Sequence, residues 1–523
     1  MKLSLYLAAS AVALAALPAP ATAQHVGHEG MAMPKPAATP KPAVKKKAVV
    51  KKKAPAKKAA TVRAAAKPQP QAEPASAPPD VDHSTMDHSA MPMPSEPAQT
   101  PVTVAPAPVD HSQMDHSQMD HGDIDQPASG GGEHATHAAM KGALGPYPVT
   151  RESSGTAWQP DNSEHLGLMT GSGDWMFMAH GVLNLVYDHQ SGRRGDDKAF
   201  ASGMLMGMAQ RPLGNGMLQF KAMVSPDPLM GKTGYPLLLA SGETANGTDR
   251  LIDRQHPHDF FMELSGSVSQ NIGPKSSVFL YAGLPGEPDF GPPAFMHREA
   301  ILDSPEAPIT HHWLDSTHIS FGVITGGVVL DRVKVEVSRF NGREPDQHRW
   351  NIETGPLDST AIRLSWNPTP ELSLQGSWGK FIDPEQLEPG VDQKRWSASA
   401  LYAREIAPGL KFAATLAWGR KSTEDHDDDA FALEASLKHR GWTVFGRGEV
   451  TENRELVEAE EHGPAFRVGK ASLGVVRDFR IADHFSLGVG GLASVNFIPG
   501  GLAALYGRRH PTGAMGFVRL KLD

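Results

Sequence analysis

The chain has 523 residues, and its 58 Asp and Glu outnumber 50 Lys and Arg, which gives a formal net charge of −8 at pH 7. It contains no Cys, so disulfides and thiolate metal sites are both excluded. Any soft metal ligand must therefore be one of its 21 Met residues.

The first residues have the pattern of a secretory signal. Lys2 supplies a positive charge, residues 3–17 are apolar, and Ala21-Thr22-Ala23 forms a small-x-small cleavage site. The apolar run is too short and too rich in Ala for a good membrane span. We expect residues 1–23 to direct export from the cytoplasm.

Residues 24–148 consist mainly of Ala, Pro, Lys, Ser and His. Such a composition buries too little apolar surface to offset its ordering entropy, so we expect a disordered leader. Lys45 to Lys58 is a strongly basic block. In an exported chain we expect it to meet anionic lipid head groups or cell-wall polymer rather than nucleic acid; a charged, extended spacer is the alternative.

Within this leader, a five-residue unit repeats from Asp110 to Gly122, and a related copy spans Asp82 to Met93. The spacing of five fits neither a helix face nor a strand face. Thioether and imidazole together favour copper, Cu(I) on sulfur and Cu(II) on nitrogen. The alternative is a solvated linker rich in His. The candidate ligands are His83, Met86, His88, Met91, Met93, His111, Met114, His116, Met119 and His121.

Residues 149–523 alternate apolar and polar side chains in segments of about ten residues. Val333, Val335 and Val337, for example, face away from Lys334, Glu336 and Ser338. This alternation with a period of two residues is compatible with a soluble sandwich or propeller and also with a membrane barrel. The regular charged face favours a barrel with a water-filled lumen, and so do the aromatic residues that tend to end the apolar face: Trp175, Tyr187, Trp366, Trp378, Trp396, Tyr402, Trp418 and Trp442.

The first alternating segment, Trp175 to Tyr187, would rise about 30 Å when tilted, close to the height of a bilayer's apolar band with its rims. Short turns are expected at 367–370, 407–409 and 439–441, and long outer loops at 225–258, 283–315 and 340–357. We predict an all-β fold, a transmembrane antiparallel β-barrel of roughly 14–16 strands in the outer membrane, with the leader in the periplasm.

The first barrel strands add a second group of candidate metal ligands. Met176, Met178 and His180 lie opposite the apolar face of their segment, and Met217 and Met223 lie beside Lys221 on the charged face of another. For Met204, Met206 and Met208 the pattern does not distinguish the two faces. Adaptable apolar packing is the alternative role for these Met residues.

The long loops are rich in His. His256 and His258 stand two residues apart beside Asp259, a carboxylate of the kind that orients a ligating imidazole. The segments 296–299 and 310–318 repeat the theme. Hydrogen bonding within loops is the alternative, as are contacts to lipid phosphates with Arg250, Arg254 and Arg298. No nucleophile elbow, phosphate loop or His-Glu-x-x-His helix is present, so we do not expect an enzyme.

The signal, the Met-Asp-His-Ser repeats at 82–93 and 110–122, and the barrel together resemble the copper-resistance B proteins of Gram-negative bacteria. The repeats are the specific part of this resemblance, whereas the barrel over 173–523 resembles that family in type only. The resemblance implies a role in copper tolerance, through sequestration or export of periplasmic copper. Implied partners are copper ions, outer-membrane lipids and, as a further candidate, a periplasmic copper protein.

Two classes of function follow. One is a non-enzymatic outer-membrane copper-binding protein, and the other is a general porin or structural barrel whose leader is only a tether. Deletion of residues 80–121 separates them, because the second class expects no change in metal tolerance.

The leader generates a prediction of its own. A peptide spanning residues 82–122 should bind Cu(I) through its Met residues and Cu(II) through its His residues. Since imidazole must be neutral to ligate, Cu(II) affinity should fall as pH drops below about 6.5, whereas Cu(I) affinity should change little. Titrations at two pH values test this, and an equal pH dependence for both ions would refute the assignment.

Overall fold

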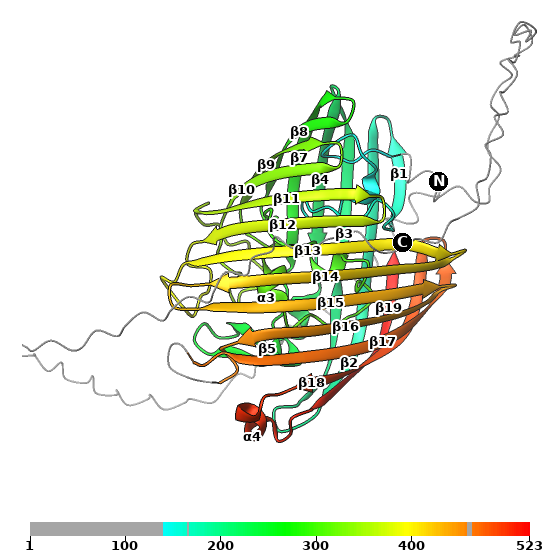
Figure 1. Ribbon diagram of the computed structural model, residues 1–523. Helices are drawn as coiled ribbons and strands as arrows, with labels where there is room; N and C mark the ends of the chain where they lie inside the picture. Colours follow the sequence, from blue (N-terminus) through cyan, green and yellow to red (C-terminus); the bar gives the residue numbers. More distant parts are fainter. Residues whose placement is uncertain (1–139, 165–166, 458–462, 523) are drawn as a thin grey trace, which may run out of the picture. The chain divides into compact units, whose positions relative to one another are not determined.

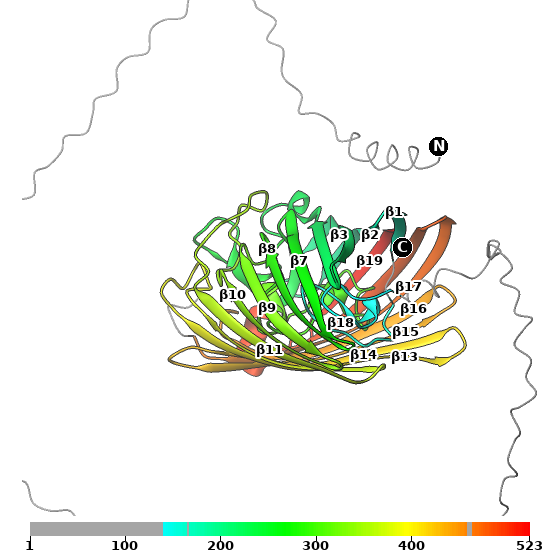
Figure 2. The ribbon, with the colours of Figure 1, turned by 90° about the horizontal axis from the view of Figure 1, so that it is seen from above.

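The structure is a computed structural model that describes residues 140–164, 167–457 and 463–522. Sixteen antiparallel strands form a closed ring, in which each strand pairs with its two neighbours and β19 pairs with β2 (Figure 1). Figure 2 shows β2 and β3 on the side of the ring opposite β11. The predicted barrel fold is confirmed, at the upper end of the expected strand count.

The ring begins with β2 (Trp175–Gln190), which β1 (Leu168–Ser172) joins as a short hairpin partner beside the end of β19. The strands that follow are β3 (Asp197–Leu213), β4 (Gly216–Val224), β7 (Phe261–Gly273), β8 (Ser276–Gly283), β9 (Val323–Leu330), β10 (Val333–Phe340), β11 (Ser359–Thr369) and β12 (Leu372–Phe381). The rest are β13 (Gln393–Ala407), β14 (Leu410–Ser422), β15 (Asp427–His439), β16 (Trp442–Asn453), β17 (Phe466–Ala482), β18 (Phe485–Phe497) and β19 (Thr512–Leu522).

Period-two alternation positions the two faces as expected. On β10, Val335 and Val337 are 41% and 47% exposed on the outside, whereas Lys334 and Glu336 are buried inside. The aromatic residues predicted for the rims all lie on the outer face. A closed ring leaves no unpaired strand edge and presents apolar side chains outward, as a bilayer requires. The fold places the protein in the outer membrane.

Connections at one end of the ring are short, and those at the other end are long. The predicted short turns and long loops fall at these two ends, which in this orientation are the periplasmic and outer ends. Two long connections carry structure of their own. The first inner loop (225–260) contains η2 (Asp227–Met230), β5 (Tyr235–Thr244) and β6 (Arg250–Gln255); the second inner loop (284–322) contains η3 (Phe295–His297), α3 (His311–Leu314) and η4 (Ser316–His318).

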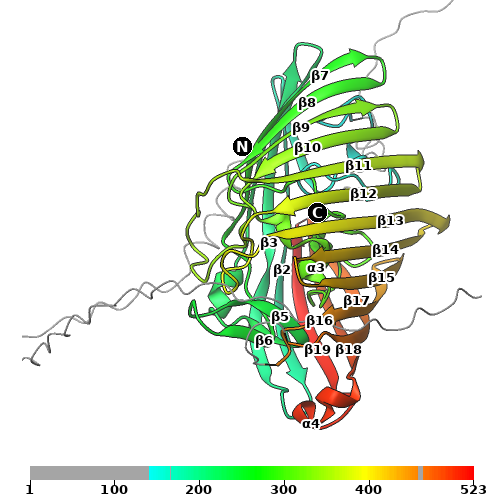
Figure 3. The same ribbon diagram turned by 60° about the vertical axis from the view of Figure 1, so that its left-hand side comes forward.

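The inner loops pack against the luminal wall. Leu237, Leu238 and Leu239 of β5 are fully buried in an apolar cluster with wall residues such as Phe445 and Phe517. Trp313 of α3 packs against Ala417 and its neighbours on β14 and β15. Figure 3 shows α3 within the ring of strands. Outside these loops, the connection between β18 and β19 holds η5 (Gly500–Leu502) and α4 (Ala503–Tyr506). Among the described residues, no helix is long and apolar enough to span a membrane.

Residues 140–164, named here the luminal segment, also pack against the wall, and they include η1 (Val149–Arg151). Ser269 and Ser277 of the wall donate hydrogen bonds to the carbonyls of Ala143 and Leu144, at 2.7 and 2.6 Å. The segment's own core is the edge-to-face pair Tyr147 and Trp158, with ring centroids 5.1 Å apart. Residues 140–148, which composition assigns to the leader, are therefore part of this packed segment.

The luminal charges correct one expectation, that of a water-filled lumen. Lys334 pairs with Glu336 at 2.9 Å, and Arg363 pairs with the same carboxylate at 2.9 Å. The luminal segment accepts further donors, since Lys334 donates to the carbonyl of Thr156 and Arg363 to its hydroxyl, and Arg363 also donates to the carbonyl of Gly291 in the second inner loop at 3.1 Å. Buried charges need such partners in place of water. The charged side chains from which a water-filled lumen was expected are instead bonded to other side chains and to segments of the protein itself.

The luminal segment generates a prediction about conduction. Deleting residues 141–164 should leave the strand ring intact, because its ladder hydrogen bonds do not involve them, and should expose Lys334 and Arg363 to water. We expect a higher ion conductance in planar bilayers than for the full chain, with unchanged heat-modifiable migration. Equal conductance of the two proteins would show that the segment does not obstruct the lumen.

Candidate metal centre

His258 lies in the first inner loop, between β6 and β7. Its Nδ1 donates to Asp227 Oδ2 at 2.9 Å, and Asp227 is held in turn by the backbone amide of Gly203 at 3.2 Å. A carboxylate on Nδ1 fixes the tautomer and leaves Nε2 as the ligating atom. Among the described residues, His258 Nε2 has no hydrogen-bond partner.

His311 and His318 come from the second inner loop, at α3 and at η4. One residue orients both rings, because His311 Nδ1 donates to the carboxylate of Asp315 at 2.8 Å and His318 Nδ1 donates to its backbone carbonyl at 2.7 Å. His318 Nε2 is likewise without a hydrogen-bond partner among the described residues. In both rings Nδ1 is therefore the bonded nitrogen, and Nε2 is the nitrogen available to a ligand.

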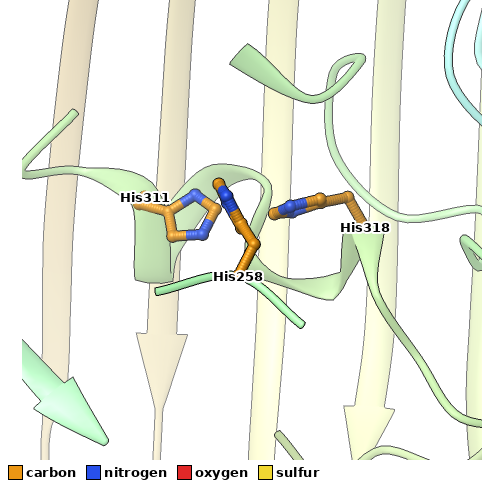
Figure 4. A group of neighbouring side chains, drawn as sticks. All are labelled: His258, His311 and His318. Atoms are coloured by element: carbon orange, nitrogen blue, oxygen red, sulfur yellow. The ribbon is translucent and has the colours of Figure 1, made fainter. Parts of the chain in front are cut away.

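The three imidazoles converge (Figure 4), and a ligand nitrogen from each lies within 4.8 Å of the others. Their ring centroids are 5.1 Å apart for His258 and His318, 5.2 Å for His311 and His318, and 6.4 Å for His258 and His311. Bonds of about 2.0–2.1 Å to a tetrahedral ion would require nitrogens roughly 3.4 Å apart. Small side-chain rotations reach that distance, so the triad can hold a transition-metal ion.

Burial favours the neutral form of His311 and His318. It lowers the pKa of His311, and it lowers the pKa of His318 well below the ordinary value, with the neighbouring imidazoles adding to the effect. Burial alone would raise the pKa of Asp315, but Arg298 and the hydrogen bond from His311 hold it below its ordinary value. Neutral imidazole is the form that ligates a metal, and ionised Asp315 is the form that orients it.

Arg298 fastens this arrangement to the barrel wall. Its guanidinium makes two hydrogen bonds of 2.7 Å to Glu434 on β15, and a third to the carboxylate of Asp315. Arg298 has no exposed surface. The planar guanidinium can donate two parallel hydrogen bonds to one carboxylate and a further one to a second carboxylate. The wall thus fixes Asp315, and Asp315 fixes two of the three rings.

Two further imidazoles flank the triad. His256 and His312 have ring centroids 5.5 Å apart. Their centroids lie 6.1 and 5.6 Å from that of His311. His256 Nε2 contacts Glu243 at 3.0 Å, and His312 Nδ1 contacts Glu344 at 3.3 Å. Of the predicted loop ligands, the structure thus places His258 in the triad and His256 beside it.

The arginines considered as lipid-phosphate contacts have other partners. Arg298 pairs with Asp315 and Glu434 as described, and Arg254 pairs with Asp196 at 3.1 Å. Arg250 bridges Glu388 and Glu455, at 2.9 and 3.3 Å. These two carboxylates form a second acidic group with Glu385, which Lys421 neutralises at 3.1 Å. This acidic group is accounted for by ion pairs.

The predicted strand ligands are luminal but separate from the triad. Met176, Met178 and His180 alternate with outward residues on β2, as expected. Met223 lies in a buried cluster with Met204, while Met217 sits opposite Pro212, next to the short β3–β4 turn. Met204, Met206 and Met208, whose face the sequence left open, share the luminal face of β3.

The leader ligands (His83, Met86, His88, Met91, Met93, His111, Met114, His116, Met119 and His121) lie outside the described residues. His311 and His318 are not among the predicted ligands, although both lie in the His-rich segment 310–318. On an extended chain, two side chains seven residues apart do not come close enough to bind one ion. Only the turn that wraps both around Asp315 brings them together.

The comparisons with known proteins bear on the fold alone. No family model matches the chain, and no curated protein matches it by sequence. Solved structures that resemble it include OmpT of Vibrio cholerae (8% identity, TM-score 0.38, 68% of this chain and 100% of that one), OprB of Pseudomonas putida (11%, 0.44, 67% and 94%) and an anion-selective porin of Comamonas acidovorans (13%, 0.38, 66% and 99%). OmpT is described as expressed in the outer membrane, and the Comamonas protein as an anion-selective porin.

The buried ion-pair network yields a stability prediction. Arg298→Met would leave Asp315 and Glu434 buried without a cationic partner, which costs about 3–5 kcal/mol in comparable sites. We expect a lower urea midpoint for the protein in lipid vesicles, followed by Trp fluorescence. Arg480→Met, at an Arg side chain that is 66% exposed, is the matched control and should change the midpoint little. Equal midpoints for both variants would contradict the role given to Arg298.

Proposed function

We propose that this outer-membrane barrel binds a divalent transition-metal ion at His258, His311 and His318 and acts in copper tolerance. The observation that carries the proposal is the convergence of three buried imidazoles, each held by Nδ1 with Nε2 left to ligate. A site of three protein ligands keeps a coordination position open. Such a site suits capture and exchange of an ion better than permanent storage.

The charges bonded around the triad support a divalent ion. Asp227, Asp315 and Glu434 are three carboxylates, and within residues 140–164, 167–457 and 463–522 the cation bonded to them is Arg298. With neutral imidazoles, this group has two negative charges in excess. A dication offsets that excess in a site that water does not reach.

Copper is the ion that the rest of the sequence favours. Imidazole accepts Cu(II), Zn(II) and Ni(II) alike, so the triad alone does not choose between them. The leader repeats add thioethers beside imidazoles, a combination that suits both oxidation states of copper. In this proposal the leader collects periplasmic copper, and the barrel holds an ion within the outer membrane.

A general porin is the second candidate, because sixteen strands is the size at which barrels leave an aqueous channel. The two candidates differ in what fills the ring. Paired charges and apolar side chains of the inner loops and the luminal segment occupy the wall's inner face. A general porin predicts high conductance of the full chain and tolerance of copper that does not depend on the triad.

The test uses the full chain loaded with Cu(II) and dialysed against a weak chelator, which strips the leader faster than a buried site. His258→Gln and His318→Gln should each lose the ion that wild type retains, and should lower copper tolerance in cells. His189→Gln, at a ring more than half exposed at the outer end of β2, is the matched control. Retention of the ion by both triad variants would refute the site.

A further inference from the structure

A second group of potential ligands lies on the luminal wall formed by β2, β3 and β4. The strand register sets His180 opposite Met206 and Met206 opposite Met223, so the three form one row across neighbouring strands. Directly opposed residues have Cβ atoms about 4.5–5.5 Å apart. Flexible thioethers on such a row can bring sulfur and imidazole to one point.

The second inner loop supplies the facing side. Met296 and His297, both in η3, line a cavity of about 120 Å³ together with His180, Met204 and Met206. The rings of His180 and His297 meet edge to face, with centroids 6.3 Å apart. Three thioethers and two imidazoles thus surround one small space. We call these five residues, with Met223, the Met-His pocket.

The charges around this pocket balance in number, so it has no excess of carboxylates to offset a cation. Four acidic residues line it, namely Glu152, Glu164, Glu299 and Asp303. Glu164 pairs with Lys411 and Lys438, at 2.5 and 3.2 Å, and Asp303 pairs with Arg519 at 2.7 Å, while Lys521 also lines the cavity. Four acidic groups thus stand against four basic groups. Thioether sulfur carries no charge that would offset a cation. A buried cation that lacks a compensating carboxylate is costly, and the cost rises with the square of its charge. The pocket therefore suits a monovalent ion.

Ligand type selects among monovalent ions. Hard cations need oxygen ligands, which the Met and His side chains do not provide. Thioether and imidazole select soft d¹⁰ ions. We propose that the Met-His pocket is a binding site for a soft monovalent metal cation, of the class of Cu(I) and Ag(I).

This second site deepens the proposed function, since it adds a position for the reduced ion beside one for the divalent ion. The two adjoin in the fold. Met204, Met223 and Met262 pack with Ile319, which directly follows His318 of the triad. The packing of Ile319 thus links the thioether row to the segment that carries His318.

Packing alone would also gather Met residues, and the test must separate the two roles. Met→Leu keeps volume and apolar character but removes the ligand. The readout is the temperature at which the full-length barrel loses its heat-modifiable migration, with Ag(I) nitrate as the probe in chloride-free buffer. An ion bound by the folded barrel raises this temperature.

We expect Ag(I) to raise the transition temperature of wild type, and the Met206→Leu/Met223→Leu variant to lose that shift while its metal-free transition stays near wild type. Met217→Leu, on the same wall but outside the pocket, should retain it. Met296→Leu, on the loop rather than the wall, provides a second variant and should weaken Ag(I) binding at least tenfold. A wild type without an Ag(I) shift, or a shift retained in both pocket variants, overturns the inference.

Zn(II) run in parallel distinguishes this inference from the proposed function. Loss of the Ag(I) shift with an unchanged Zn(II) shift in the pocket variants supports the thioether site. His258→Gln should show the reverse, with the Ag(I) shift kept and the Zn(II) shift lost. Loss of the Ag(I) shift in Met217→Leu as well would overturn the inference, because the effect would then not be local to the pocket.

Discussion

The arrangement inside this barrel depends on one buried guanidinium. Arg298 joins a carboxylate of the wall, Glu434, to a carboxylate of the second inner loop, Asp315, and all three side chains are shielded from water. Removing any one of them leaves an uncompensated charge in a low-dielectric site. The loop is thereby held in one position relative to the wall. Because Asp315 also orients two imidazoles, the same ion pairs fix the candidate metal centre.

The barrel wall acts as a scaffold for its own loops. Its inner face bears charged and apolar residues, and each kind is matched by a segment of suitable chemistry. The apolar face of β5 packs against Phe445 and Phe517, while the carbonyls of the luminal segment receive the donors of Lys334 and Ser269. Such matching needs a closed and rigid ring, because luminal residues from distant strands have to meet one inserted loop at once.

Two ligand chemistries occupy neighbouring parts of this interior. The triad combines imidazoles with buried carboxylates, whose charge would offset that of the proposed divalent ion. The Met-His pocket combines thioethers with imidazoles where acidic and basic side chains balance in number, which would suit a soft monovalent ion. The chain has no Cys, so imidazole and thioether are its nitrogen and sulfur side-chain ligands for a metal such as copper. Imidazole suits the divalent state, and thioether suits the monovalent state.

The sequence by itself determined the barrel and its two faces. Val335 had to face lipid and Lys334 the lumen, because side chains alternate along any strand and only a closed ring satisfies its backbone in a bilayer. The same parity placed Met176, Met178 and His180 inside. Composition also marked the loop around His256 and His258 as a candidate ligand segment.

Only the tertiary structure decided what fills the ring and which imidazoles meet. Residues 258 and 311 belong to different loops, and no local pattern encodes the distance between them. That distance is set by contacts such as Arg298 with Glu434, which join residues far apart in the chain. The face of Met206 was undecided for a related reason, since its neighbours Leu205 and Gly207 are apolar or small as well. Pairing with His180 and Met223 on adjacent strands resolved it.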